Sequence, residues 1–266
     1  MLTIGVDSGS VATKGVLFDG CEIRGLLQIP TGWSPKESAL QAYEELLRRH
    51  GVSAVQRVVG TGYGRITMDF AQRTITEITC HAKGVYMLNP EVRAVIDIGG
   101  QDSKVMALNE KGSVREFQMN DKCAAGTGRF LQNTLVQLGE DIVHLDALAD
   151  HEEPQKISSM CTVFAESEIV SLLAGGVSKG SIAAGLAESV AERVAALFAR
   201  IRSEGVVAFT GGVSRSEVIR KALEMRIGQP LYRPELSPFT GAIGAAVLAF
   251  QDLSATAESV ADVLPE

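Results

Sequence analysis

The sequence lacks three features that would direct it to nucleic acid or to a membrane: a basic run, a long apolar run and a basic leader. Its 266 residues carry a formal net charge of −7 with a pI near 5.3, which argues against nucleic acid or an anionic membrane as a principal partner. No window approaches the ~20 apolar residues that span a bilayer. The start, Met1–Ile4, has no basic residues before an apolar stretch, unlike a secretory signal. We therefore expect a cytoplasmic protein.

Cysteine is also scarce, with four residues in the chain. Disulfides are rare in a reducing cytoplasm, so each cysteine is weighed as a core residue, a nucleophile or a metal ligand. Cys21 lies in an expected hairpin and Cys80 in an apolar helical segment, and we assign both to packing. Cys123 lies among polar and glycine-rich residues, which argues against core filling, and Cys161 precedes a helical segment.

A motif of the form D-x-G-x-x-x-x-K occurs twice, at Asp7–Lys14 and again at Asp97–Lys104. Each copy follows one apolar strand-like run and leads into another, so each glycine-rich element is predicted at the tip of a hairpin. Glycines there let backbone N–H groups approach phosphate oxygens closely. Two such hairpins facing each other would clamp a triphosphate. The length allows two small domains, and the repeat favours that division.

The repeat supplies most of the candidate nucleotide site. Asp7 and Asp97, at the strand ends, are suited to hold Mg²⁺ directly or through water. A tight turn is the alternative for either copy alone, and a solvated strand residue is the alternative for Lys14 and Lys104. Two matched copies favour phosphate binding. Nucleotide contacts are expected from Ser8, Gly9, Ser10, Thr13, Lys14, Asp97, Gly99, Gly100, Gln101, Asp102 and Ser103.

Hydrophobic periodicity predicts the same opening pattern in both halves. The first half reads as three strands, a helix, a strand and a helix, and the second half restarts at Val92 with three strands. The expected elements after the first hairpin are strand Cys21–Ile29, helix Ser34–His50, strand Val55–Thr61 with a flexible loop at Gly60–Gly64, helix Glu77–Leu88, strands 92–98, 103–108 and 112–119, helices 125–138, 163–174 and 179–203, strand 205–210 and helix 215–226.

Two further glycine-rich segments are nucleotide candidates. A buried strand runs through Val206–Ser214 into a double-glycine turn, a geometry that lets a flat adenine or ribose lie against bare backbone. The segment Gly241–Ala246 opens the last helix with small residues, which permits close packing on a helix or a ligand. A purely structural role is equally compatible with either segment alone, but their position after two phosphate hairpins favours nucleotide contact. The expected contacts are Gly211, Gly212, Val213, Gly241 and Ala242.

This order of motifs resembles the actin, heat-shock-70 and sugar-kinase superfamily of ATPases. The resemblance implies an α/β fold of two related ribonuclease-H-like (actin-like ATPase) domains with a nucleotide cleft between them. The expected domains are 1–90, completed by a C-terminal helix at 238–262, and 91–237, which carries the cluster-binding segments. ATP or ADP and Mg²⁺ are the implied ligands.

The segments Asn120–Leu131 (NDKCAAGTGRFL) and Ser159–Glu168 (SMCTVFAESE) narrow the resemblance. They are similar to cluster-binding segments of the activators of 2-hydroxyacyl-CoA dehydratases, in the BadF/BadG/BcrA/BcrD-type ATPase family, which also includes ATPase subunits of benzoyl-CoA reductases. Similarity runs over essentially the whole chain, and K-C-A-A-G-T-G-R-F is its specific part. The family implies a homodimer with one [4Fe-4S] cluster between subunits. ATP hydrolysis would drive an electron to a dehydratase- or reductase-type iron–sulfur enzyme, with a ferredoxin or flavodoxin as reductant.

The chemistry of two cysteines agrees with that implication. Cubane clusters are commonly held by four thiolates, so Cys123 and Cys161 from each of two chains would complete the set. Each precedes a predicted helix, whose N-terminus favours a thiolate. Buried inert thiols, a redox pair and a zinc site are the alternatives, although the histidines are too scattered for a zinc pattern with the two cysteines; these are His81, His144 and His151.

Hydrolysis requires a water molecule in line with the γ-phosphate. In the superfamily the helix before the second hairpin often begins with an acidic or amide residue, and here Glu77 occupies that position. Glu77 is the candidate that orients the water, Gln101 is its competitor, and Asp7 joins the catalytic set through Mg²⁺. A helix-start acid stabilised by the dipole is the alternative for Glu77. Glu166 and Glu168 are assigned to support of the cluster helix.

Two other functions fit the nucleotide motifs. A small-molecule kinase of the same fold would need an Asp base in a sugar pocket, and no such signature is found in the sequence. A nucleotide-dependent switch without a cluster is the second alternative. Neither uses the cysteine-containing segments.

Overall fold

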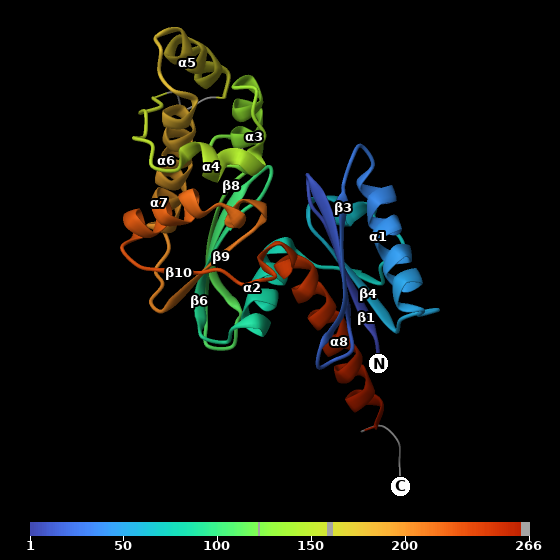
Figure 1. Cartoon of the computed structure of the whole chain (residues 1–266). Coiled ribbons are helices and arrows are strands. Elements are labelled where there is room, and N and C mark those ends of the chain that lie inside the picture. Colours follow the sequence, from blue (N-terminus) through green and yellow to red (C-terminus); the bar gives the residue numbers. More distant parts are fainter. Residues whose placement is uncertain (122, 159–161, 262–266) are drawn as a thin grey trace. The chain divides into compact units, whose positions relative to one another are not determined.

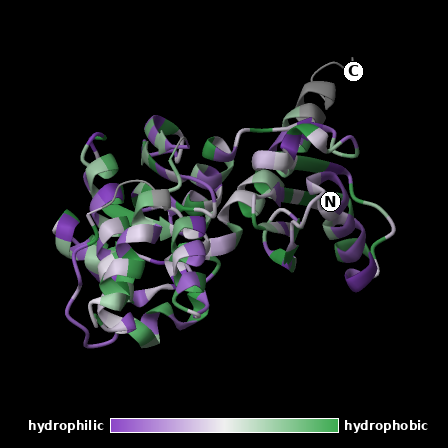
Figure 2. Ribbon diagram, turned by 90° about the horizontal axis from the view of Figure 1, so that it is seen from above, coloured by the Kyte–Doolittle hydropathy of each residue, from purple (hydrophilic) through white to green (hydrophobic). Residues whose placement is uncertain are grey.

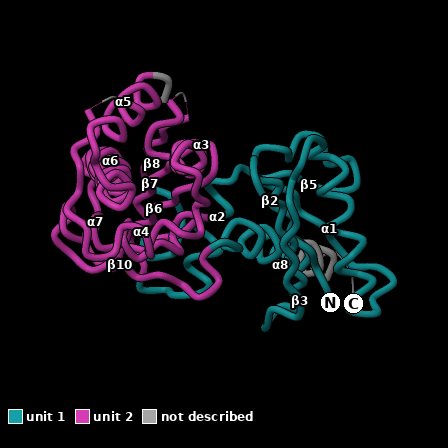
Figure 3. The backbone as a smooth tube through the Cα atoms, turned by 45° about the horizontal axis from the view of Figure 1, so that its top comes forward, with its two compact units in different colours: residues 1–91, 109–114, 238–266 teal, residues 92–108, 115–237 magenta. Residues whose placement is uncertain are grey.

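The computed structural model describes residues 1–121, 123–158 and 162–261 (Figure 1). The chain forms two compact units, coloured separately in Figure 3. Unit 1 comprises Met1–Glu91, Asn109–Val114 and Pro238–Glu266, and unit 2 comprises Val92–Leu108 and Arg115–Ser237. The short excursion at 109–114 belongs to unit 1 because the Tyr86 hydroxyl donates a hydrogen bond to the Glu110 carbonyl at 3.0 Å.

Unit 1 is built on a five-stranded sheet of order β3-β2-β1-β4-β5. Strands β1, β2 and β3 form an antiparallel meander, and β4 and β5 continue the sheet parallel to β1. Strand β1 is buried along its whole length because helices cover both faces. The bounds are β1 (Thr3–Ser8), β2 (Ala12–Phe18), β3 (Ile23–Pro30), β4 (Arg57–Thr61), β5 (Arg73–Thr74), α1 (Pro35–His50), α2 (Glu77–Leu88) and α8 (Thr240–Ala261).

Helix α1 has sequence signals at both ends. The Ser34 hydroxyl accepts a hydrogen bond from the Glu37 N–H, Pro35 occupies the first turn, and Gly51 ends the helix with φ of 62°. Its buried side chains, which include Ala39 and Leu46, join the core of unit 1 with strands β1 and β2.

The small residues that open α8 allow very close packing. A Cβ placed on Gly244 would collide with the Cys80 carbonyl of α2, and one placed on Gly84 of α2 would collide with the Thr240 carbonyl. Ala242 is fully buried, and its carbonyl lies against Gly5 of β1. Close packing on a neighbouring helix, one of the two roles expected for this segment, is therefore confirmed.

Unit 2 repeats the sheet of unit 1, in the order β10-β9-β6-β7-β8. Strand β6 pairs antiparallel with β7 and parallel with β9, as β1 does with β2 and β4. The prediction of two related α/β halves is thus confirmed. The bounds are β6 (Val92–Ile98), β7 (Ser103–Leu108), β8 (Val114–Asn120), β9 (Val206–Thr210), β10 (Leu231–Tyr232), α3 (Gly128–Gln137), α4 (Leu145–Ala149), α5 (Thr162–Ala174), α6 (Lys179–Phe198) and α7 (Glu217–Ile227).

The longer elements agree with the periodicity to within a few residues, while the shortest ones carry no pattern to detect. Helix α6 ends at Phe198 rather than at 203, and α3 begins at Gly128 rather than at 125. The segment expected as a loop at Gly60–Gly64 instead enters a 3₁₀ helix, Tyr63–Thr67. Figure 2 shows hydrophobic and hydrophilic residues alternating along the helices of both units. Among the described helices, none has the length and apolar composition needed to span a membrane.

The two cysteines assigned to packing differ in their surroundings. Cys80 is fully buried, as expected. Cys21, however, is exposed in the turn after β2, so its assignment to packing is wrong. That turn is held by the Asp19 carboxylate, which accepts hydrogen bonds from the backbone N–H groups of Cys21 and Glu22 at 2.8 Å. The hairpin was predicted correctly, but Cys21 lies at its solvent-exposed end.

This difference predicts selective alkylation. Burial raises the pKa of the Cys80 thiol to about 12, so at pH 8 only about one part in ten thousand is the reactive thiolate. In native protein at pH 8 we expect iodoacetamide to modify Cys21 within minutes and to leave Cys80 intact, as read by peptide mass spectrometry. Labelling in denaturant provides the control, because both thiols then react. Equal rates in the native protein would contradict the burial of Cys80.

Candidate functional site

The repeated motif places its Asp and Lys opposite each other across a hairpin. In unit 1, Asp7 of β1 is the register partner of Lys14 of β2, with 3.6 Å between Oδ2 and Nζ. In unit 2, Asp97 of β6 faces Lys104 of β7 in the same way, at 3.5 Å. Both aspartates are almost completely buried, at 4% and 2% exposure. The spacing of the motif therefore encodes a cross-strand ion pair at the base of each turn.

In unit 2 this ion pair is buried and has additional partners. Lys104 also contacts Asp102 Oδ1 at 2.7 Å, and its side chain is 3% exposed. Lys104 is therefore not a solvated strand residue. The other oxygen of Asp97, Oδ1, accepts a hydrogen bond from the Thr210 hydroxyl at 2.8 Å. Both carboxylate oxygens of Asp97 thus have protein partners.

The equivalent carboxylate in unit 1 is less constrained. Thr61 of β4 is the register partner of Asp7, as Thr210 is of Asp97. The buried Thr61 hydroxyl makes no hydrogen bond to Asp7 within the described residues, and it neighbours the Cys80 thiol instead. Mg²⁺ usually takes one or two carboxylates and completes its shell with water and phosphate oxygens. Asp7 therefore has fewer protein partners than Asp97, and Mg²⁺ binding by either carboxylate stays a prediction.

The turn residues and the hydroxyls before each Lys have different roles. Gly9 and Ser10 are partly exposed, as are Gly99 and Gly100, and Gln101 is exposed, so the turn backbones are accessible. Thr13 is buried, and its hydroxyl contacts those of Thr31 and Ser38 at 2.9 and 3.0 Å. The buried Ser103 hydroxyl donates to the Gly126 carbonyl. These contacts disagree with the expected phosphate role of the Thr13 and Ser103 hydroxyls, which instead hold the hairpins to neighbouring segments.

Ser8, which was also expected to contact the nucleotide, ends strand β1. Its residue is buried, and its hydroxyl lies 3.5 Å from the Pro35 carbonyl, at the limit of a hydrogen bond. Ser8 therefore faces the start of α1, whereas the partly exposed Ser10 lies in the turn.

A second repeat, missed in the sequence analysis, follows the strand beside each hairpin. Thr61-Gly62 ends β4 and Thr210-Gly211 ends β9, each leading into a 3₁₀ helix. Gly62 and Gly211 share one backbone conformation, with φ of 86° and 88°, which glycine adopts readily. A Cβ on Gly62 would collide with Asp7, and one on Gly211 with the Ile98 carbonyl. The shared T-G dipeptide after an apolar run was the detectable signal.

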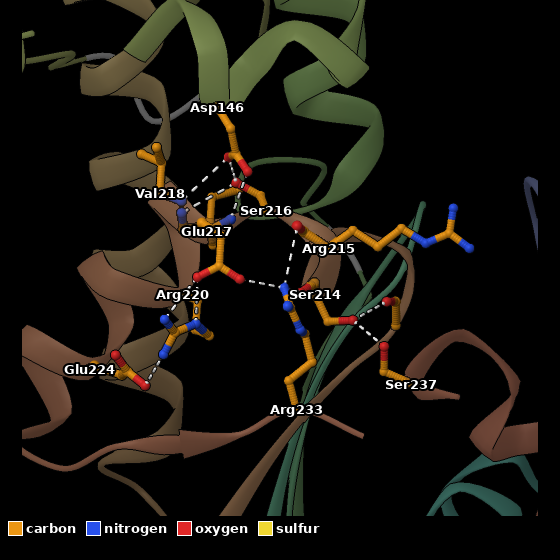
Figure 4. Close-up of polar contacts among 12 residues, drawn as sticks. Asp146, Ser214, Arg215, Ser216, Glu217, Val218, Arg220, Glu224, Arg233 and Ser237 are labelled. Atoms are coloured by element: carbon orange, nitrogen blue, oxygen red, sulfur yellow. Dashed lines mark hydrogen bonds and ion pairs between the residues drawn. The ribbon is translucent and has the colours of Figure 1, made fainter. Parts of the chain in front are cut away.

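The Gly211–Val213 loop is held by hydrogen bonds shown in Figure 4. The Ser214 hydroxyl lies 2.7 Å from the Gly211 carbonyl and 2.8 Å from the Ser237 hydroxyl. The Arg233 guanidinium donates to the Ser214 carbonyl at 3.3 Å. Gly212 is exposed while Val213 is buried, so the loop presents bare backbone on a fixed support.

The start of α7 beside this loop is capped by a carboxylate from α4 (Figure 4). Asp146 accepts hydrogen bonds from the Ser216 hydroxyl at 2.5 Å and from the Glu217 and Val218 N–H groups at 2.8 and 3.3 Å. A hydrogen bond from the Arg220 guanidinium lowers the pKa of the Glu217 carboxyl. Sequence reasoning did not identify Asp146, because α4 is too short to carry periodicity.

Glu77 is the first residue of α2. Thr76 precedes it as the N-cap, and its hydroxyl accepts a hydrogen bond from the Thr79 N–H at 3.4 Å. Glu77 is partly buried. This position is compatible both with orientation of a water molecule and with a helix-start acid, so the role of Glu77 stays a prediction.

The first cysteine-containing segment is folded tightly before α3. Cys123 is exposed, and the Asn120 side chain donates to the Cys123 and Ala125 carbonyls at 3.1 Å. Thr127 caps α3 by accepting from the Phe130 N–H at 3.4 Å. The Cys123 thiol is therefore exposed in a loop held by hydrogen bonds, and its role as a cluster ligand stays a prediction. Within the described ranges, no three His, Cys, Asp or Glu residues of one chain converge as a metal site.

The second cysteine, Cys161, lies outside the described residues. The helix after it, α5, begins at Thr162, one residue before the expected start at 163. Glu168 of α5 accepts a hydrogen bond from the Ser158 N–H at 2.8 Å. This contact agrees with the supporting role expected for Glu168, while Glu166 is exposed.

The second hairpin is hydrogen-bonded directly to the start of α3. The Gly128 N–H donates to the Gly99 carbonyl at 2.9 Å, and the Arg129 N–H donates to the Gly100 carbonyl at 2.8 Å. A Cβ on Gly128 would lie 3.1 Å from the Gly99 oxygen and 3.2 Å from Val213. The turn expected to bind phosphate, the Gly211–Val213 loop and the helix after Cys123 therefore meet at Gly128.

Comparison with known proteins agrees with these features. The model of the BadF/BadG/BcrA/BcrD ATPase family matches residues 4–249. The chain belongs to this family and is an ATPase. Two solved members share its structure with a TM-score of 0.91: component A of (R)-2-hydroxyglutaryl-CoA dehydratase from Acidaminococcus fermentans and the activator of 2-hydroxyisocaproyl-CoA dehydratase from Clostridium difficile with bound ADPNP.

The similarity to these family members covers nearly all of each chain. The first is 38% identical, with 96% of this chain and 99% of that chain covered, and the second is 39% identical, with 100% and 99% covered. A benzoyl-CoA reductase polypeptide from Thauera aromatica is 34% identical over 92% of either chain. The family resemblance is therefore confirmed, whereas the roles of individual nucleotide and cluster residues stay predictions.

The cap on α7 leads to a test of stability. Asp146→Ala removes the carboxylate that accepts two α7 amide hydrogen bonds, so we expect the free energy of unfolding to fall by about 1–2 kcal/mol. Urea denaturation followed by circular dichroism measures this change. Asp150→Ala is the matched control, because Asp150 is exposed and directly follows α4, the helix that carries Asp146. An equal effect of the two variants would contradict the capping role.

Proposed function

We propose that this ATPase is an electron-transferring activator that works as a homodimer. Hydrolysis of ATP drives an electron from a [4Fe-4S] cluster between the subunits to an iron–sulfur enzyme of the 2-hydroxyacyl-CoA dehydratase type. The observation that carries the proposal is the pair of hydrogen bonds from Gly128 and Arg129 to the second hairpin, which connects a phosphate-type turn to the Cys123 segment. A small-molecule kinase has no need of this connection, and a switch without a cluster would not use the thiol of Cys123.

The proposed nucleotide contacts follow from exposure and chemistry. In unit 1 the turn amides of Gly9 and Ser10 bind phosphate oxygens, with Lys14 close by and Asp7 holding Mg²⁺. In unit 2 the turn at Gly99–Asp102 binds phosphate, and Gly211–Val213 supports the adenosine; the ADPNP bound to the C. difficile activator supports a nucleotide ligand. Glu77 orients the hydrolytic water, with Gln101 as its alternative. The buried residues Asp97, Gly241 and Ala242 support the turns and the helix start that make these contacts.

The proposed cluster ligands are Cys123 and Cys161. One chain offers two such thiols and a cubane takes four, so a twofold dimer completes the set. When bound, the cluster supplies a one-electron carrier. The protein's own contribution is to hold Cys123 in a loop tied by Asn120 and to place amide dipoles of α3 close to it.

Within unit 2, backbone geometry would transmit a movement of the Gly99–Asp102 turn to the start of α3. When the Gly99–Asp102 turn gains or loses a phosphate contact, its carbonyls move with its amides, because each peptide unit is rigid. The Gly99 and Gly100 carbonyls hold the first N–H groups of α3. The start of α3, and with it the segment after Cys123, therefore moves with the turn.

Partner and location are proposed by the same reasoning. Two of the three relatives are components or activators of 2-hydroxyacyl-CoA dehydratases, at 38% and 39% identity, against 34% for the benzoyl-CoA reductase polypeptide. We therefore place the partner in the dehydratase class, with a ferredoxin or flavodoxin as reductant. A cytoplasmic location provides ATP and these reductants.

Replacing one cluster ligand tests the cluster. Cys123→Ala should abolish iron binding and leave affinity for ADP unchanged, because the nucleotide residues lie elsewhere in the sequence. Iron content and visible absorbance of anaerobically purified protein, together with calorimetry of ADP binding, measure both effects. Cys21→Ala is the matched control, since Cys21 is also exposed. A Cys123→Ala protein with full iron would refute the assignment.

Disturbing Gly128 tests the connection between hairpin and helix. A Cβ at Gly128 would press on Gly99 and Val213, so Gly128→Ala should retain the cluster and lower the ATP-dependent reduction of the partner, per ATP hydrolysed, by about tenfold. Stopped-flow absorbance of the cluster and phosphate release give the two rates. In Gly175→Ala, where a Cβ meets nothing closer than 3.4 Å, the ratio should stay at the wild-type value. An unchanged ratio in Gly128→Ala would show that the two processes are connected elsewhere.

A further inference from the structure

His81 is buried in unit 1 without a role in the function proposed above. It lies on α2, one helical turn after Glu77, and is 7% exposed. Its Nδ1 lies 3.0 Å from the hydroxyl of Thr240, which is fully buried at the start of α8. The orientation of the imidazole ring is therefore fixed by a contact between two helices.

The other ring nitrogen and the Asp7 carboxylate approach the same side of α8, beside Gly241. A Cβ on Gly241 would lie 3.0 Å from His81 Nε2 and 2.9 Å from Asp7 Oδ2. Gly241 is buried and is not among the glycines with positive φ. Its backbone conformation therefore does not require glycine, which costs about 1 kcal/mol relative to alanine in a helix. The reason for glycine at 241 is the polar gap between imidazole and carboxylate, which a methyl group would fill.

We propose that His81 is a positioning residue for the Mg²⁺-binding carboxylate of Asp7; this inference rests on the function proposed above. The Thr240 hydroxyl donates to Nδ1, which leaves the proton on Nε2. That N–H donates to Asp7 Oδ2, directly or through one water molecule in the gap beside Gly241. The carboxylate is thereby held between His81 and Lys14 in the orientation that binds the Mg²⁺ of Mg-ATP.

Two substitutions at position 81 separate this role from a structural one. The amide of glutamine reaches the place of Nε2, and that of asparagine reaches the place of Nδ1. His81→Gln should therefore keep the Asp7 contact, and His81→Asn should keep only the Thr240 contact. Gly241→Ala leaves the His81–Thr240 contact in place and fills the gap, so it should behave like His81→Asn.

The measurement is the affinity for ADP by calorimetry, with Mg²⁺ and with chelator, and the Mg²⁺ concentration that half-saturates ATP hydrolysis. In His81→Asn and Gly241→Ala we expect the gain in ADP affinity due to Mg²⁺ to fall about tenfold, the scale of one hydrogen bond to a charged group. In His81→Asn the affinity with chelator should be unchanged, and His81→Gln should stay within about twofold of wild type. His144→Asn, at an exposed histidine, is the matched control.

The outcomes distinguish the inference from the function on which it rests. Wild-type Mg²⁺ dependence in both His81→Asn and Gly241→Ala would overturn the role of His81 and leave the proposed ATPase site intact. A His81→Asn protein that behaves like wild type while His81→Gln fails would reduce His81 to a structural link with Thr240. A wild-type protein whose ADP affinity does not respond to Mg²⁺ would overturn both proposals.

Discussion

A nearly buried aspartate facing a lysine across a hairpin is the interaction on which the candidate site depends. A carboxylate removed from water is costly unless a charge or hydrogen-bond donors compensate it. Lys14 compensates Asp7, and Lys104 compensates Asp97, each from the opposite strand of the same hairpin. The ion pair fixes the register of the two strands and so the position of the glycine-rich turn between them. The proposed binding of phosphate by the turn amides depends on this ion pair, because it positions the turn.

The two copies of this hairpin have diverged in what surrounds the carboxylate. In unit 2, Asp97 is bonded to Thr210 and Lys104, and Lys104 is shared with Asp102. In unit 1, Asp7 lacks the threonine contact among the described residues, and it adjoins the gap beside Gly241 that separates it from His81. In the proposed site, the first copy supplies the carboxylate for a metal ion and the second supplies a rigid base. A duplicated fold can divide tasks in this way because its scaffold is preserved while the neighbours of each motif change.

The rigid hairpin of unit 2 suits the proposed coupling between its turn and helix α3. The carbonyls of its turn accept the first hydrogen bonds of α3, which otherwise would need a side-chain cap or water. Thr127 caps the next amide. Helix α3 is therefore anchored to the hairpin at the end nearest Cys123. An ordinary helix start lacks such backbone hydrogen bonds to a neighbouring turn. Here they connect the segment after Cys123 to the second hairpin.

Local patterns were sufficient for most of the fold. The strands of both meanders and helices such as α1 were predictable, because periodicity and capping residues are local properties, and the specific segment around Cys123 indicated the family. The exposed position of Cys21 and the short helix that supplies Asp146 were not predictable, since neither has a local signature.

The sequence alone indicated that this chain contains one motif twice, each copy in a hairpin of three opening strands, and that it resembles an ATPase family. Tertiary structure decided which motif residues face solvent and which face the core. Thr13 and Ser103 look like phosphate donors in the sequence, yet their partners are Thr31, Ser38 and Gly126. His81 belongs to no motif in the sequence but faces Asp7 in the fold. These roles depend on contacts between residues far apart in the chain, and a pattern of neighbouring residues carries no information about such contacts.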